Sequence, residues 1–122
     1  MNGSDTFDAD ALSLRGLELL AEGNAIEAVR EFRAAIAADD NHMEAHHGLV
    51  RALRDAGKFE DSIGAALRLT VLTPYDPLAH TALSISLQQA GHVPAAEAAA
   101  ARARVLEWKI ELQTRPEGGS GF

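Results

Sequence analysis

The sequence predicts an all-α fold, an α-solenoid of three helix–turn–helix units with six helices. The main observation is a spacing of 34 residues that glycines and leucines share. The glycines are Gly23, Gly57 and Gly91, and the leucines are Leu19, Leu53 and Leu87. A fixed period of this length, with small and apolar residues in register, is typical of proteins built from stacked repeats.

Each unit is predicted to contain two helices separated by a turn at the glycine, because glycine adopts the positive φ that often ends a helix. In the middle unit, Leu49 and Leu53 are four residues apart and share one helical face. Pro74 ends this unit, since proline cannot donate the next helical hydrogen bond. The predicted helices span residues 9–22, 25–39, 43–56, 59–73, 77–90 and 93–114.

Polar residues mark three of the helix starts. Asp76 precedes Pro77, which is the pattern of an N-cap followed by the first helical residue. Asn24 and Asn41 are each followed three residues later by a glutamate, which indicates capping boxes at these two starts.

A single domain is expected over residues 9–114. Residues 1–8 are predicted to be a flexible N-terminus. Residues 115–122 are predicted to be a disordered tail, because Pro116 and the glycine-rich run after it cannot continue a helix. The repeats are expected at about residues 9–42, 43–76 and 77–110, with a helical extension to 114.

The composition argues against several classes of function. The 122-residue chain has a net charge of −7, which disfavours nucleic acid, because phosphate binding needs clustered Lys and Arg. It contains no cysteine, so disulfides and thiolate catalysis are excluded. No secretory signal or membrane-spanning run is visible. Since no catalytic constellation emerges either, we expect a cytoplasmic protein that is not an enzyme, has no cofactor, and binds neither nucleic acid nor membrane.

Apolar, small and turn residues recur at fixed places in the three units. They are Gly16, Leu19, Gly23, Ala28, Phe32, Ala35 and Ile36 in the first unit, Leu49, Leu53, Gly57, Phe59, Ile63, Leu69 and Pro74 in the second, and Leu83, Leu87, Gly91, Ala96 and Ala103 in the third. This pattern resembles the tetratricopeptide repeat family over about residues 9–110. The resemblance implies a right-handed superhelical array, a concave groove lined by the first helix of each unit, and a scaffold role in binding a peptide or protein partner.

Family members that clamp a terminal carboxylate use Lys, Asn and Arg on these first helices. The corresponding positions in this chain are Ser13, Leu17, Gly48, Leu78 and Ala82. None of them carries a matching side chain, so we do not expect this mode of peptide binding.

The resemblance also indicates which residues turn toward the groove. They are Asp10, Ser13, Leu17, Leu20, Glu44, His47, Arg51, Arg54, Leu78, Thr81, Ile85 and Gln88. His47, Arg51 and Arg54 are three or four residues apart and share one helical face. Apolar zones beside this face would suit a peptide with an acidic residue between apolar ones. Alternatively, the two arginines are solvated and pair loosely with Asp55 or Glu44.

The histidines offer a weak candidate for a metal site. His42 and His46 have the spacing that lets two imidazoles reach one metal ion, and His47 is adjacent. A third ligand such as Glu44 or His80 would be needed, and no complete metal motif is present. Because His46 and His80 are one repeat apart, packing explains them better, and we expect no metal. His47 could make the groove sensitive to pH.

The last predicted helix continues past the position where Pro74 ends the middle unit. Val105, Trp108 and Leu112 form an apolar stripe along it. This stripe is a candidate interface for a homodimer, which would make the protein a self-assembling structural protein. The alternative is a monomer in which Trp108 packs back against the fifth helix or its own neighbours and in which Glu97 and Arg104 partly make the terminal face polar.

Overall fold

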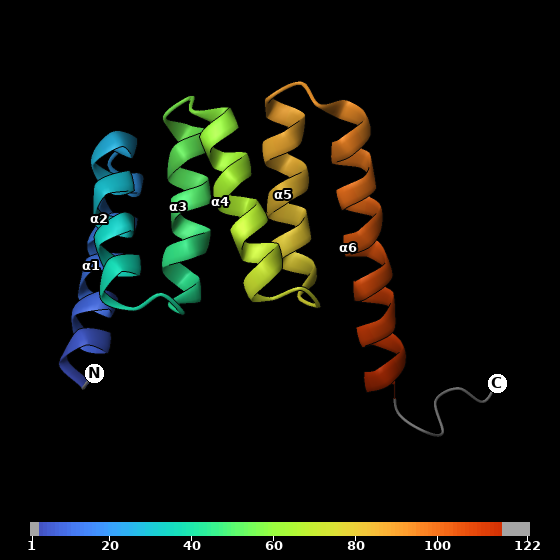
Figure 1. Ribbon diagram of the computed structural model, residues 1–122, viewed down its shortest axis with the longest axis horizontal. Helices are drawn as coiled ribbons and strands as arrows, with labels where there is room; N and C mark the ends of the chain where they lie inside the picture. The colour runs from blue at the N-terminus through green and yellow to red at the C-terminus, as the bar shows by residue number, and fades with distance from the viewer. Residues whose placement is uncertain (1–2, 116–122) are drawn as a thin grey trace.

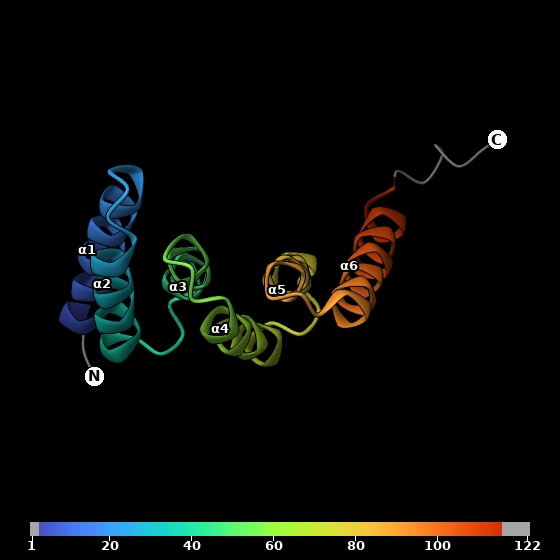
Figure 2. The same cartoon turned by 90° about the horizontal axis from the view of Figure 1, so that it is seen from above.

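The computed structural model describes residues 3–115, which form six α-helices and no strand. The helices are α1 (Gly3–Ala21), α2 (Ala25–Ala38), α3 (Met43–Asp55), α4 (Phe59–Leu72), α5 (Pro77–Gln89) and α6 (Val93–Thr114). They stand in a row, and each runs antiparallel to the next (Figure 1). Seen from above, α3 and α5 lie on one side of the row and α4 lies on the other (Figure 2). The predicted all-α solenoid is confirmed.

The first helix is longer than predicted. It begins at Gly3 instead of residue 9, so residues 3–8, which we expected to be flexible, are its first turns. The segment contains no proline that would prevent a helix from extending backwards. Residues 1–2, and residues 116–122 of the predicted tail, lie outside the part of the chain that the structure describes.

The three repeated glycines end the first helix of each unit in the same way. Gly23, Gly57 and Gly91 have φ angles of 84°, 77° and 90°. In the middle unit, the N–H of Lys58 donates to the carbonyl of Leu53 at 2.8 Å and that of Gly57 to Arg54 at 2.9 Å. This is the Schellman motif, and equivalent bonds occur at the other two turns. Each turn therefore needs its glycine for its backbone conformation.

Two clusters of buried side chains hold the row together. In the first, Phe32 and Leu53 are 0% and 1% exposed, and residues of α1, α2 and α3 contribute. In the second, Val50 and Leu69 join residues of α3, α4 and α5. Among the described helices, α6 contacts only α5, and it buries a row of small and apolar residues, namely Ala96, Ala99, Ala103 and Leu106. It continues past the start of α5, so its C-terminal part projects from the row (Figure 1).

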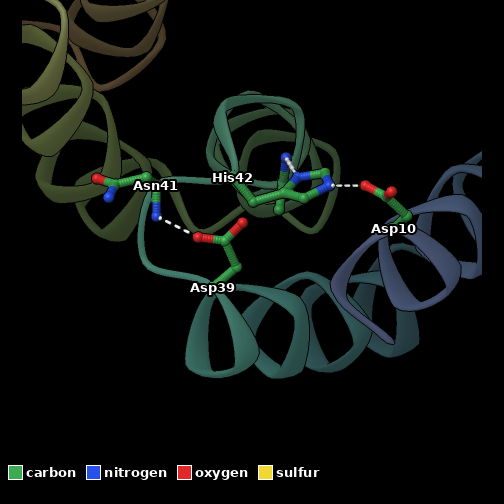
Figure 3. A network of polar contacts seen from close by, with 5 residues as sticks. Asp10, Asp39, Asn41 and His42 are labelled. Carbon is green, nitrogen blue, oxygen red and sulfur yellow. Dashed lines mark hydrogen bonds and ion pairs between the residues drawn. The ribbon is translucent and has the colours of Figure 1, made fainter. Parts of the chain in front are cut away.

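The start of α3 corrects one of the predicted caps. The N-cap is His42, not Asn41, and its Nδ1 accepts a hydrogen bond from the N–H of Ala45 at 3.1 Å. Because Nδ1 accepts, the neutral ring carries its proton on Nε2, which lies 2.6 Å from Oδ1 of Asp10 on α1. The N–H of Asn41 donates to Asp39 instead (Figure 3). His42 therefore caps α3 and links it to α1.

The other two predicted starts differ from each other. At α5 the prediction is confirmed, since the Asp76 carboxylate accepts from the N–H of Leu78 at 2.9 Å and proline follows the cap. At α2 the predicted capping box is wrong. Asn24 makes no side-chain cap bond, and its amide instead donates to Glu22 at 3.4 Å.

Candidate functional site

A groove of about 500 Å³ runs across the face formed by the first helix of each unit. It is lined by Leu17 and Leu20 from α1, by Met43, Glu44, His47, Gly48 and Arg51 from α3, and by Asp76 and Leu78 at the start of α5. The repeat places these segments side by side, because α1, α3 and α5 are equivalent helices of successive units and α3 contacts both of the others.

Half of the residues predicted for this groove line it. The predicted residues that line the groove are Leu17, Leu20, Glu44, His47, Arg51 and Leu78. Arg54, Thr81, Ile85 and Gln88 are not part of it, and Asp10 bonds to His42 instead. The structure corrects the prediction that Ser13 turns toward the groove. Ser13 is only 3% exposed, so it faces the packed interior and cannot offer a surface to a ligand.

The lining also includes Met43, Gly48 and Asp76, which were not among the residues predicted to turn toward the groove. Met43 lies four residues before His47 and eight before Arg51, a helical spacing that could have placed it on the same face. Asp76 lies next to the groove because it caps α5. Gly48 had been singled out only as a position where some family members carry a residue that clamps a carboxylate.

Apolar side chains dominate the rim of the groove. Leu17 is 47% exposed and Leu78 is 63% exposed, while Leu20 and Met43 are partly buried. Covering such surface is favourable by about 25 cal/mol per Å² of apolar area. Leu17 and Leu78 come from the first and third units, so a ligand that covers both must cross α3.

The floor of the groove is held by a close contact beneath it. A Cβ added at Gly48 would lie 2.3 Å from Cε1 of Phe32, and one added at Gly16 would lie 2.7 Å from the same ring. The ring of Phe32, which is 0% exposed, is thus wedged between α1 and α3. One repeat later the equivalent of Phe32 is Ala66, so this arrangement belongs to the first two units.

The groove carries charges of both signs. Arg51 supplies a guanidinium group to the groove. Its Nε lies 3.8 Å from Oδ2 of Asp55, and its side chain is 65% exposed. Such an exposed pair contributes at most about 1 kcal/mol, so Arg51 can turn to a ligand. Glu44 and Asp76 supply carboxylates. Burial lowers the pKa of His47, an effect that Asp76 opposes, so burial favours the neutral form of this ring.

The candidate metal ligands make structural hydrogen bonds. His42 uses both ring nitrogens, as described above, and His46 donates from Nε2 to the carbonyl of Asp40 at 2.7 Å. One repeat later, His80 makes the same bond to the carbonyl of Pro74 at 2.8 Å. Within residues 3–115, no group of three or more His, Cys, Asp or Glu side chains is placed to hold a metal ion.

The predicted stripe on the last helix lies at the surface. Val105 is 41%, Trp108 61% and Leu112 46% exposed. With this exposure, Trp108 is not buried against α5. None of the described helices is both long and apolar enough to cross a bilayer.

Stacked antiparallel helix pairs with a groove along one face define an α-solenoid of the helical-repeat class. A family model described as "Tetratricopeptide repeat" matches residues 19–84, more than half of the chain. The chain therefore belongs to the tetratricopeptide repeat family, a family of protein-interaction modules. A search of curated proteins found no match.

Solved structures with the same fold include three of particular interest. The second tetratricopeptide repeat domain of Spaghetti (RPAP3), bound to the HSP90 peptide SRMEEVD, is 17% identical with a TM-score of 0.77, covering 84% of this chain and 95% of that one. MamA is 19% identical (TM-score 0.79, 87% and 61% covered). The Yersinia enterocolitica type III secretion translocator chaperone SycD, in an alternative dimer, is 19% identical (TM-score 0.79, 95% and 84% covered). At these identities the likeness concerns the fold.

Proposed function

We propose that this protein is a non-enzymatic interaction module that binds a peptide segment of a partner protein in the groove between α1, α3 and α5. The observation that carries the proposal is the exposure of Leu17 and Leu78 on the rim of one continuous hollow of about 500 Å³. Large apolar side chains around a few polar groups are the usual composition of a ligand site.

The polar groups suggest what the segment contains beside its apolar residues. An acidic side chain of the segment would meet Arg51, whose contact with Asp55 is long and exposed. A basic or hydroxyl group would meet Glu44 or Asp76. We therefore propose a segment of apolar residues interrupted by polar ones, which fits an amphipathic helix or an extended strand.

The segment is proposed to be internal to its partner. The domain of RPAP3 was solved with an HSP90 peptide, but the positions that correspond to a carboxylate clamp are here occupied by Leu17, Gly48, Leu78 and others without a positive charge. Apolar contacts in place of cations favour side chains over a terminal carboxylate.

The test is a selection of peptides from a random library displayed on phage, followed by affinity measurements on variants of the protein. Leu17→Asp places a charge in the groove and should weaken the selected peptides about tenfold or more, because a buried apolar contact becomes an unpaired charge. Leu67→Asp is the matched control, since Leu67 is 49% exposed on α4 and does not line the groove.

The outcomes separate the proposal from its alternatives. Peptides that lose affinity for Leu17→Asp and keep it for Leu67→Asp support binding in the groove. If every selected peptide bound Leu17→Asp as well as the unmodified protein, the groove would not be the binding surface. Arg51→Glu should weaken chiefly those peptides that contain an acidic residue.

A further inference from the structure

The face of α6 that points away from α5 carries an ordered set of residues. In chain order they are Val93, Glu97, Ala100, Ala101, Arg104 and Trp108. Spacings of three and four residues put them on one side of the helix, opposite the row that is buried against α5. Val93 is 43% and Trp108 61% exposed, and Glu97 and Arg104 are also exposed. Neither charged residue forms an ion pair within residues 3–115.

This order is self-complementary when the helix meets a second copy of itself in the antiparallel direction. With a two-fold axis between Ala100 and Ala101, Glu97 of one copy lies opposite Arg104 of the other, and Val93 lies opposite Trp108. Along the helix axis, Glu97 and Arg104 are each about 5 Å from the two-fold, and Val93 and Trp108 each about 11 Å. Each charged residue of this face thus meets an opposite charge, and each large apolar residue meets another apolar one.

We propose that this protein forms a symmetric dimer in which the α6 helices of two copies pack antiparallel, with Glu97 paired to Arg104 of the other copy and Trp108 packed on Val93. The alanines at the centre let the helix axes approach to about 8 Å, which brings the flanking charges within reach of each other. A two-fold axis repeats each contact, as in most homodimers.

The charges also disfavour an end-to-end stack of copies as a longer solenoid. In such a stack, α6 would pack on α1 of the next copy as α2 packs on α3. The outer face of α1 carries Arg15 and Glu18, and Glu22 follows directly after the helix. These residues stand at the positions of Leu49, Ala52 and Ala56 in the next unit. Because consecutive helices are antiparallel, Glu97 would meet Glu18 and Glu22 and Arg104 would meet Arg15. Like charges oppose this arrangement.

The proposed interface is small and lies apart from the groove. It has far fewer residues than the roughly 20–30 a side of a stable interface, so we expect a reversible dimer with a Kd of about 1–100 μM. The groove is lined from α1, α3 and the start of α5, so dimerisation leaves both grooves open. The inference is therefore independent of the proposed peptide binding.

Sedimentation equilibrium of the unmodified protein and of two charge reversals tests the pairing. Glu97→Arg alone and Arg104→Glu alone should each weaken the dimer about tenfold or more, because attraction becomes repulsion at two symmetric places. The double variant should regain most of the affinity. An equimolar mixture of the two single variants should form heterodimers, because each copy then carries two like charges that face two opposite ones.

Arg102→Glu is the matched control. Arg102 is exposed on α6 but lies off the proposed face, so the same change of charge should leave the dimer intact. Trp108→Ala should weaken the dimer, whereas Ile110→Ala, at a residue that is 43% exposed on another face, should not. Circular dichroism confirms that each variant is folded.

Two results would overturn the inference. One is a monomer at every concentration up to about 500 μM, well above the expected Kd. The other is a dimer that both single reversals leave unchanged, which would place the contact elsewhere on the molecule.

Discussion

Gly48 lies directly against the ring of Phe32, so closely that a Cβ at position 48 would stand 2.3 Å from Cε1 of the ring. Gly16 approaches the same ring from α1. One buried aromatic side chain therefore sets how closely α1 and α3 can lie, and these two helices form most of the groove.

Gly48→Ala should lower the free energy of unfolding by about 1–3 kcal/mol, because the ring is fully buried and must shift to admit the methyl group. Urea denaturation measures this loss. In a Phe32→Leu background the same alanine should cost clearly less, since the two nearest ring atoms, Cε1 and Cζ, are absent from leucine. An equal cost in both backgrounds would show that the contact with Phe32 is not the cause.

Gly57 and Gly64 should respond in opposite ways to alanine, although a Cβ has open space at both. Gly57 has a φ of 77°, so Gly57→Ala should destabilise the protein by about 1–2 kcal/mol. Gly64 is inside α4, so Gly64→Ala should stabilise it by about 0.5–1 kcal/mol. Thermal and urea denaturation of the pair provide the comparison, and a shift of the same sign in both would contradict the backbone explanation.

His42→Ala should destabilise the protein by about 1–2 kcal/mol, because it removes both the cap of α3 and the bond to Asp10. His42→Asn should recover part of this loss, since asparagine is a good N-cap but is too short to reach α1 in the same way. Asp10→Asn should cost less than His42→Ala, because it leaves the cap in place. If His42→Ala were neutral, the network in Figure 3 would not contribute to stability.

His47 should make the protein less stable in mild acid. Burial lowers its pKa below the usual value of 6.5, so as pH falls through about 6.5 the unfolded chain binds a proton before the folded protein does, and the free energy of unfolding decreases. Above about pH 7 both states are neutral and His47 contributes nothing. His47→Gln should therefore lose less stability than the unmodified protein between about pH 7.5 and 5.5. Parallel curves for the two proteins would contradict this.

The helices and turns were predictable because the bonds that form them are local. Gly57 recurs at each turn since the Schellman motif needs a positive φ at this residue, and Leu53 recurs because its side chain belongs to the buried face of the helix. Asp76 and Pro77 likewise act within one turn of helix. Asn41 was a plausible cap by the same logic, but the cap is His42, which also reaches Asp10 on another helix.

The residues of the groove were predictable only in part. His47 and Arg51 follow from their spacing along one helix and Leu17 from the family resemblance, whereas Ser13 shows that position in a helix does not tell which edge of a face is covered by a neighbour. Asp76 joined the lining only because α5 begins beside α3.

By itself, the sequence determined a row of six helices with glycine turns, because a period of 34 residues repeats the same local hydrogen bonds three times. Only the tertiary structure decided that Phe32 is wedged beneath Gly48, that Leu17 and Leu78 share one groove, and that Trp108 stands in solvent. These facts depend on the distances and rotations between helices, which are set by the packing of side chains far apart in the chain.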